Sequence, residues 1–113
     1  MPPTPGRFEV VMTHGAARDL EAIDHYLCHH DSVASAERVL KRLVAALEQL
    51  ERLPDRGPHP RELLALGIRE FRQLVVKPYR LIYRVEGKTV IVHLVADARR
   101  DFQSLLARRL LGD

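Results

Sequence analysis

The stretch from residue 70 to residue 101, EFRQLVVKPYRLIYRVEGKTVIVHLVADARRD, is the part of this sequence that most restricts the fold. Runs rich in valine, isoleucine and tyrosine alternate with Lys77-Pro78 and with Gly87, and apolar runs between such turn residues are typical of strands joined by tight turns. The pattern predicts strands over residues 71–76, 79–86 and 89–96. Because the connections are short, consecutive strands should pair antiparallel as a meander.

Alternation along these strands assigns their side chains to two faces of the sheet. The first face should form the core, with Tyr79, Leu81, Tyr83 and Val85 on the second strand and Val90, Val92, Leu94 and Ala96 on the third. The second face is semi-polar, with Arg80, Ile82 and Arg84 on the second strand and Ile91, His93, Val95 and Asp97 on the third. We expect Arg80, Arg84 and His93 to meet there, joined by Arg72 if the strand register allows it.

The residues before this stretch have the periodicity of two amphipathic helices. Thr13 can cap a helix of roughly residues 14–29. Asp31 or Ser32 can cap a second helix of about residues 33–53, which the following proline ends. The apolar stripes are Ala16, Leu20, Ile23 and Leu27 on the first helix and Ala36, Leu40, Leu43, Leu47 and Leu50 on the second. The short connection between them predicts an antiparallel helical hairpin.

Shorter elements complete the chain. A β-rich run at residues 8–12 predicts a first strand, and residues 61–67 can hold one helical turn that ends at a glycine. Asp97 can cap a C-terminal helix whose apolar stripe is Phe102, Leu105, Leu106 and Leu110. The order β-α-α-β-β-β-α predicts an α+β fold: an N-terminal strand and a helical hairpin packed on a three- to four-stranded antiparallel sheet, with a C-terminal helix.

Length and composition limit the class of protein. A chain of 113 residues fits one domain, expected over residues 8–113 after a disordered, proline-rich lead over residues 1–7. No apolar run approaches the roughly 20 residues of a membrane span. One cysteine, Cys28, cannot form an internal disulfide, which fits a reducing cytoplasm. His25 and His29 have a spacing found in helical metal sites but lack a further ligand set, so we expect no metal and no cofactor.

Charge is distributed unevenly along the chain. The formal net charge is only +3, but residues 54–113 contain seven acidic and twelve basic residues, whereas residues 13–53 contain seven acidic and five basic residues. The half of the chain that forms the sheet is therefore the basic half. Such asymmetry predicts a partner that meets the sheet side, either an acidic protein segment or a phosphate backbone.

Two segments in this order resemble a known family. The block PYRLIYRVEGKTVIVHLVADARRDF and the segment ARDLEAIDHYL, with Asp19, Leu20, Ile23, Tyr26 and Leu27, are similar to the RelE/ParE toxins of bacterial type II toxin–antitoxin systems. The resemblance covers about residues 8–105. It implies a small toxin that a co-expressed antitoxin neutralises. Within the superfamily, RelE-like members cut mRNA on the ribosome, whereas ParE-like members poison DNA gyrase and have no ribonuclease activity.

The available side chains favour the ParE-like branch. Cleavage of RNA by its own 2′-OH needs a base, an acid and cations for the developing phosphorane charge. Arg72, Lys77, Arg80, Arg84 and Arg99 offer the cations. His93 is the one histidine in the sheet segment, and Phe102 lies near the position where the resemblance implies a proton-transferring tyrosine in RelE-like enzymes. A net charge of +3 is also low for a ribosome-binding protein.

The sequence thus predicts a ParE-like toxin that inhibits DNA gyrase, with a ParD-like antitoxin as partner. The predicted target-binding residues are Arg72, Arg80, Arg84, Arg99 and Arg100, and no catalytic residue is expected. The alternative is a ribosome-dependent mRNA endoribonuclease that uses His93, Arg80 and Arg99. A third possibility is a toxin fold that has lost its target. At the level of single residues, Arg80 and Arg84 could instead form surface ion pairs with Glu70 or Glu86, and His93 could be a hydrogen-bonded sheet residue.

Overall fold

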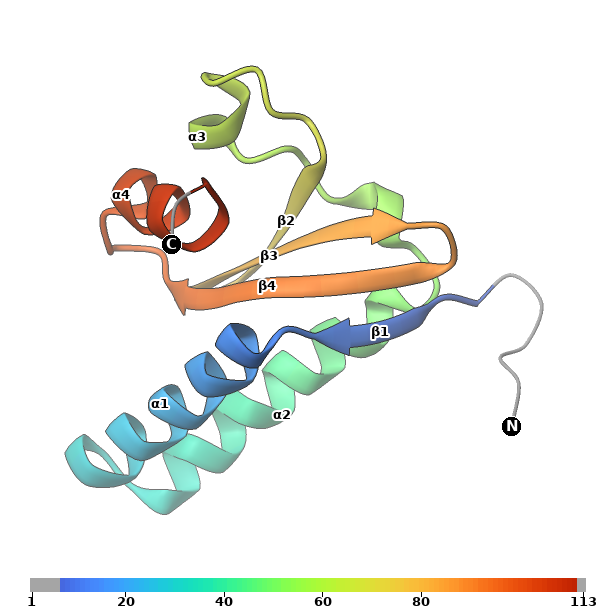
Figure 1. Cartoon of the computed structure of the whole chain (residues 1–113). Coiled ribbons are helices and arrows are strands. Elements are labelled where there is room, and N and C mark those ends of the chain that lie inside the picture. Colours follow the sequence, from blue (N-terminus) through green and yellow to red (C-terminus); the bar gives the residue numbers. More distant parts are fainter. Residues whose placement is uncertain (1–6, 112–113) are drawn as a thin grey trace.

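One four-stranded sheet organises the computed structural model, which describes residues 7–111 (Figure 1). Its strands are β1 (Glu9–Met12), β2 (Phe71–Val76), β3 (Tyr79–Glu86) and β4 (Thr89–Asp97), in the spatial order β1-β4-β3-β2. The three C-terminal strands are antiparallel, as predicted. The first strand was predicted to belong to an antiparallel sheet, but β1 pairs parallel with β4, so the sheet is mixed. Alternation within four residues indicates a strand, but long-range packing decides its partner and direction.

Two long helices cover one face of this sheet. The helices are α1 (His14–His30), α2 (Val33–Leu50), α3 (Arg61–Leu64) and α4 (Phe102–Leu106), with short turns η1 (Pro54–Arg56) and η2 (Ala107–Leu111). Thr13 and Ser32 cap α1 and α2 through their hydroxyl groups, as expected. The α2 helix ends at Leu50, three residues earlier than predicted, because a residue that precedes proline disfavours helical dihedrals and Leu53 already has φ −134°.

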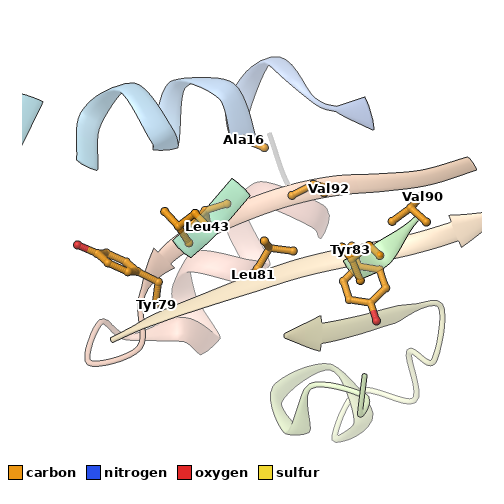
Figure 2. Packing of buried hydrophobic residues seen from close by; sticks show 9 residues of the cluster. Ala16, Leu43, Tyr79, Leu81, Tyr83, Val90 and Val92 are labelled. Carbon is orange, nitrogen blue, oxygen red and sulfur yellow. The ribbon is translucent and has the colours of Figure 1, made fainter. Parts of the chain in front are cut away.

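The larger hydrophobic core lies between the helical hairpin and the sheet. Its buried members are Ala16, Leu43, Leu50, Tyr79, Leu81, Tyr83, Val90, Val92 and Val95. Figure 2 shows Tyr79, Leu81 and Tyr83 along β3, with Val90 and Val92 on the neighbouring strand β4. The hydroxyl of Tyr83, whose side chain is fully buried, donates to the carbonyl oxygen of Pro54 at 2.6 Å, so its one polar group is satisfied within the core.

A second apolar core fills the opposite face, which the alternation had marked as semi-polar. Its buried members are Leu63, Phe71, Ile82, Leu94, Ala96, Phe102, Leu105 and Leu106, supplied by the sheet, α3 and α4. The cause is a β-bulge: Ile82 pairs with Leu94 but Tyr83 pairs with Val92, so His93 is the extra residue. Beyond a bulge every side chain changes face. The prediction for Leu94, Ala96 and Val95 was therefore wrong.

The C-terminal helix begins later than predicted. Its N-cap is Asp101, whose carboxylate accepts from the backbone N–H of Ser104 at 3.2 Å, and not Asp97. The predicted disordered lead over residues 1–7 lies outside the described residues except for Arg7. Between residues 7 and 111, no helix combines the length and the apolar character needed to cross a membrane.

Candidate functional site

Arg80 lies on β3 and faces α3 and α4. Its guanidinium donates to the two carboxylate oxygens of Glu62 at 2.8 and 2.9 Å and to the side-chain oxygen of Gln73. It also lies 4.0 Å from the centroid of the Phe102 ring. The hydrogen bonds from Arg80 lower the pKa of the Glu62 carboxyl, although burial opposes that shift. With only 13% of its side chain exposed, Arg80 is neutralised by Glu62, where the sequence suggested Glu70 or Glu86.

Arg84 and His93 meet, as the sequence predicted, but Arg80 does not join them because it is bound to Glu62 and Gln73. The Nε atom of Arg84 donates to Nε2 of His93 at 3.1 Å, and the same guanidinium pairs with Glu86 at 3.0 Å. Burial, and then the positive charges of Arg84 and Arg109, lower the pKa of His93 below its ordinary value. Because Nε2 accepts a hydrogen bond in this arrangement, His93 is neutral. That nitrogen is therefore occupied by the hydrogen bond from Arg84.

Arg72 does not join this group. Its register partner is Tyr83, and residues directly opposite each other in an antiparallel pair share a face, so Arg72 lies on the face opposite Arg80 and Arg84. Its Nη1 atom donates to the carbonyl oxygen of Gly57 at 2.8 Å. The predicted arginine surface is thus divided: the strand arginines occupy two faces of the sheet and are engaged within the fold.

Arg99 and Arg100 lie in the turn that follows β4, and both are exposed. The Nε and Nη2 atoms of Arg99 donate to the two carboxylate oxygens of Asp97, at 2.9 and 2.6 Å. These hydrogen bonds, together with the one from the Arg99 backbone N–H, lower the pKa of Asp97 to about 2. Arg100 forms no ion pair with any residue between 7 and 111. In this turn Arg99 is therefore held by Asp97, whereas Arg100 has no acidic partner among the described residues.

The two arginines border a hollow of about 470 Å³ between α1 and the adjoining ends of β3 and β4, which we call the α1–β4 hollow. Its lining residues are Asp19, Ala22, Ile23, Tyr26, Leu27, Pro78, Tyr79, Val95, Ala96, Asp97, Arg99 and Arg100. Sequence reasoning identified the arginines but treated Tyr26 only as part of a motif. The missed signal was the position of Tyr26: it lies beside the apolar stripe of α1 and not within it, so its aromatic ring is exposed.

A second missed feature links the two ends of the chain. Both Nη atoms of Arg109 donate to the carboxylate of Asp19 at 3.0 Å, and the same carboxylate accepts from the backbone N–H of Val95, just after the bulge, at 3.0 Å. Arg109 also donates to the carbonyl oxygen of His93 at 3.0 Å. This pairing was not predicted, since no local sequence pattern relates residues 90 positions apart.

A groove runs between α2 and the edge strand β2, which we call the α2–β2 groove. It consists of two adjoining hollows of about 620 and 440 Å³. Its apolar floor includes Leu50, Leu74 and Val75, and its basic border is formed by Arg42, Arg52, Arg56 and Lys77. None of these residues lines the α1–β4 hollow. The α2–β2 groove and the α1–β4 hollow are thus two separate concave surfaces, each bordered by basic residues.

The arrangement favours binding over acid–base chemistry. Acid–base catalysis of RNA cleavage needs a base near the attacking hydroxyl and an acid near the leaving oxygen. His93 is engaged with Arg84, and Phe102 packs beneath Arg80 and cannot transfer a proton. Within residues 7–111 no group of three or more histidine, cysteine, aspartate or glutamate side chains is placed to hold a metal ion.

Comparisons with known proteins agree on the family. Residues 10–102 match the family model described as ParE toxin of type II toxin–antitoxin system, parDE. Toxin ParE3 of Caulobacter vibrioides is 27% identical over 100 residues, which are 88% of this chain and 96% of that protein. A chain of the chromosomal ParDE system from P. aeruginosa has the same fold, with a TM-score of 0.69 at 19% identity over 81% of this chain and 97% of that chain.

One RelE-type structure is also similar. A chain from the toxin–antitoxin complex RelBE2 of Mycobacterium tuberculosis aligns with a TM-score of 0.59 at 26% identity, covering 80% of this chain and 98% of that chain. The fold is therefore common to both branches of the superfamily, and fold alone does not select between their functions.

Proposed function

Because the chain belongs to the ParE toxin family of type II toxin–antitoxin systems, we propose that it arrests growth by binding and inhibiting DNA gyrase in the cytoplasm. The observation that carries the proposal is the match to the ParE toxin model over residues 10–102, nearly the whole of the described fold. The geometry supports it, because the candidate site offers exposed cations and concave surfaces, whereas His93 is bonded to Arg84 and Phe102 cannot transfer a proton.

The state of Arg80 gives the proposal a second argument. A phosphorane stabiliser must present its positive charge to the substrate. Arg80 instead donates to both oxygens of Glu62 and is covered by Phe102. Releasing it would leave the half-buried Glu62 carboxylate without its partner, which is unfavourable. Of the predicted target-binding residues, Arg99 and Arg100 remain the best placed, whereas Arg72, Arg80 and Arg84 serve the fold.

We also propose that a cognate ParD-like antitoxin neutralises this toxin, as the family implies. The α2–β2 groove supports that part of the proposal, because its apolar floor and basic border suit an amphipathic segment with acidic residues. The neighbouring edge of β2 is partly covered, since Phe71 accepts a hydrogen bond from His59 and Gln73 donates one to Pro58. Val75, which is exposed, leaves a short stretch of that edge open.

A supercoiling assay with purified gyrase tests the function. Relaxed plasmid, ATP and gyrase are incubated with increasing toxin, and cleavage complexes are trapped with detergent and protease. We expect loss of supercoiling and accumulation of linear plasmid, both prevented when the toxin is first mixed with its antitoxin. Unchanged supercoiling and no linear plasmid at a tenfold molar excess of toxin would contradict gyrase inhibition. Expression without antitoxin should also arrest growth, whereas a toxin fold without a target would not.

The second candidate function is mRNA cleavage on the ribosome. The similarity to the RelBE2 chain favours it. Primer extension on mRNA translated in the presence of the toxin distinguishes the two functions. Under the gyrase proposal no codon-positioned cuts appear. Cuts that disappear in His93→Ala would establish the ribonuclease instead.

A further inference from the structure

The α1–β4 hollow has the features of a protein-binding site. We propose that it captures a peptide segment of the toxin's target, seating one apolar or aromatic side chain of that segment in the hollow and one carboxylate beside Arg100. The occupant is a segment of gyrase, so the inference rests on the proposed function and adds to it the surface and the chemistry of recognition.

The floor and wall of the hollow are apolar and include two tyrosines. Ile23 and Leu27 come from α1, and Tyr79 comes from β3 with only 8% of its surface exposed. Tyr26 borders the opening with 61% of its surface exposed, and its ring stacks on His30 with 4.4 Å between centroids. Tyrosine and arginine around a concave apolar surface are the residue types that dominate binding energy at protein interfaces.

One of the two border arginines, Arg99, is held by contacts within the fold. Arg99 has 84% of its side chain exposed, yet two hydrogen bonds to Asp97 fix its guanidinium, and the backbone N–H of Ala98 donates to the carbonyl oxygen of Pro78 at 2.7 Å. A rigid, exposed border loses little conformational entropy when a partner binds. Arg100, next in the chain and unpaired among the described residues, supplies the charge that a carboxylate would meet.

The charges of the hollow favour a protein over a nucleic acid. Its lining contains two arginines and two aspartates, which cancel formally. Asp97 neutralises Arg99, and Asp19 is neutralised by Arg109 from outside the lining. A phosphate backbone needs several unpaired cations along its path. One unpaired arginine beside an apolar hollow instead complements a peptide segment that has one carboxylate next to an apolar side chain.

Surface variants can test the site without disturbing the fold. Tyr26→Ala and Arg100→Ala remove exposed side chains, so the melting temperature should stay within about 2 °C of that of the wild type. The matched controls are Leu66→Ala and Arg69→Ala, exposed residues near α3 that do not line the hollow. Affinity for each purified gyrase subunit is measured by surface plasmon resonance, and inhibition by the supercoiling assay. Affinity for the antitoxin is measured in parallel.

We expect each hollow variant to weaken gyrase binding about tenfold and the double variant about 100-fold, as for residues at the centre of an interface. The controls should bind within twofold of the wild type, and all variants should bind antitoxin normally. Wild-type inhibition that the double variant retains would overturn the inference while leaving the function intact. A wild type with no effect on gyrase would overturn the function and, with it, this choice of occupant.

Two other results would reassign the hollow. If the double variant inhibits gyrase normally but binds antitoxin more than tenfold more weakly, the hollow belongs to the antitoxin. If the wild type binds a 20-base-pair DNA duplex without gyrase, and the double variant does not, the hollow is a phosphate-binding site. Either outcome contradicts the proposal of a peptide segment of the target.

Discussion

The Asp19 carboxylate offers a quantitative test of how this fold holds its two ends together. Asp19→Ala removes two hydrogen bonds from Arg109 and one from the backbone N–H of Val95. Each hydrogen bond to a charged group contributes about 1.5–3 kcal/mol, but bonds that share one carboxylate are not additive. Alanine also has a higher helix propensity than aspartate, which offsets about 0.5 kcal/mol of that loss. We expect the free energy of unfolding to fall by about 3 kcal/mol.

Two partner variants divide that loss. Arg109→Ala leaves the bond from the Val95 amide intact but also removes the bond to the carbonyl oxygen of His93, so it should cost about 2 kcal/mol. Asp19→Asn retains an oxygen for that amide but loses the charge, and should cost about 1.5 kcal/mol. Glu21→Ala, on the exposed side of the same helix, is the matched control and should stay within about 0.5 kcal/mol of the wild type.

Urea unfolding followed by circular dichroism measures these differences, and thermal scans should show a shift of about 4 °C for each kcal/mol. A cost of less than about 1 kcal/mol for Asp19→Ala would contradict a stabilising role for these contacts. So would a larger cost for Asp19→Asn than for Asp19→Ala, because asparagine retains an oxygen that can accept from the Val95 amide.

Three further predictions concern single residues. Gly57→Ala should lower the free energy of unfolding by about 2 kcal/mol or more in urea titrations, because an added Cβ meets a backbone carbonyl of β2 that cannot retreat. The Asp97 carboxyl should titrate near pH 2 by NMR. Its stabilising effect is therefore complete above its ordinary pKa of 3.8 and is lost as the pH falls through about 2. Arg99→Ala should return the pKa of Asp97 toward 3.8. The pKa of His93 should lie below its ordinary value in an NMR titration, and Arg84→Ala should raise it, whereas an unchanged value would contradict the assigned contact.

The elements were predictable from the sequence because their signals are local. Hydroxyl caps at Thr13 and Ser32, turns at Gly67 and Gly87, and alternation over β2 and β3 each lie within a few residues. The direction of β1 and the second core were not predictable in the same way. Both depend on contacts between distant segments, and a single extra residue at His93 reverses the faces of the rest of β4.

The candidate site was predictable only in part, for a related reason. Adjacent arginines are visible in the sequence, and Arg99 and Arg100 do reach the surface. Burial and partners are not visible, since Glu62 comes from α3 and reaches Arg80 only when that helix packs beside α4. The hollow beside Tyr26 required the same long-range information, because its walls come from α1, β3 and β4.

Ion pairs within the fold weaken the positive potential of several arginines in the basic half of the chain. Arg80, Arg84 and Arg99 each have an acidic partner within 3.0 Å. A paired arginine contributes little to the field that a distant polyanion experiences, because its partner cancels it within a Debye length. Electrostatic steering should therefore matter less for this toxin than shape and apolar contact. With Arg80 and Arg84 neutralised in this way, the sheet is better suited to holding a protein surface than to binding an RNA backbone.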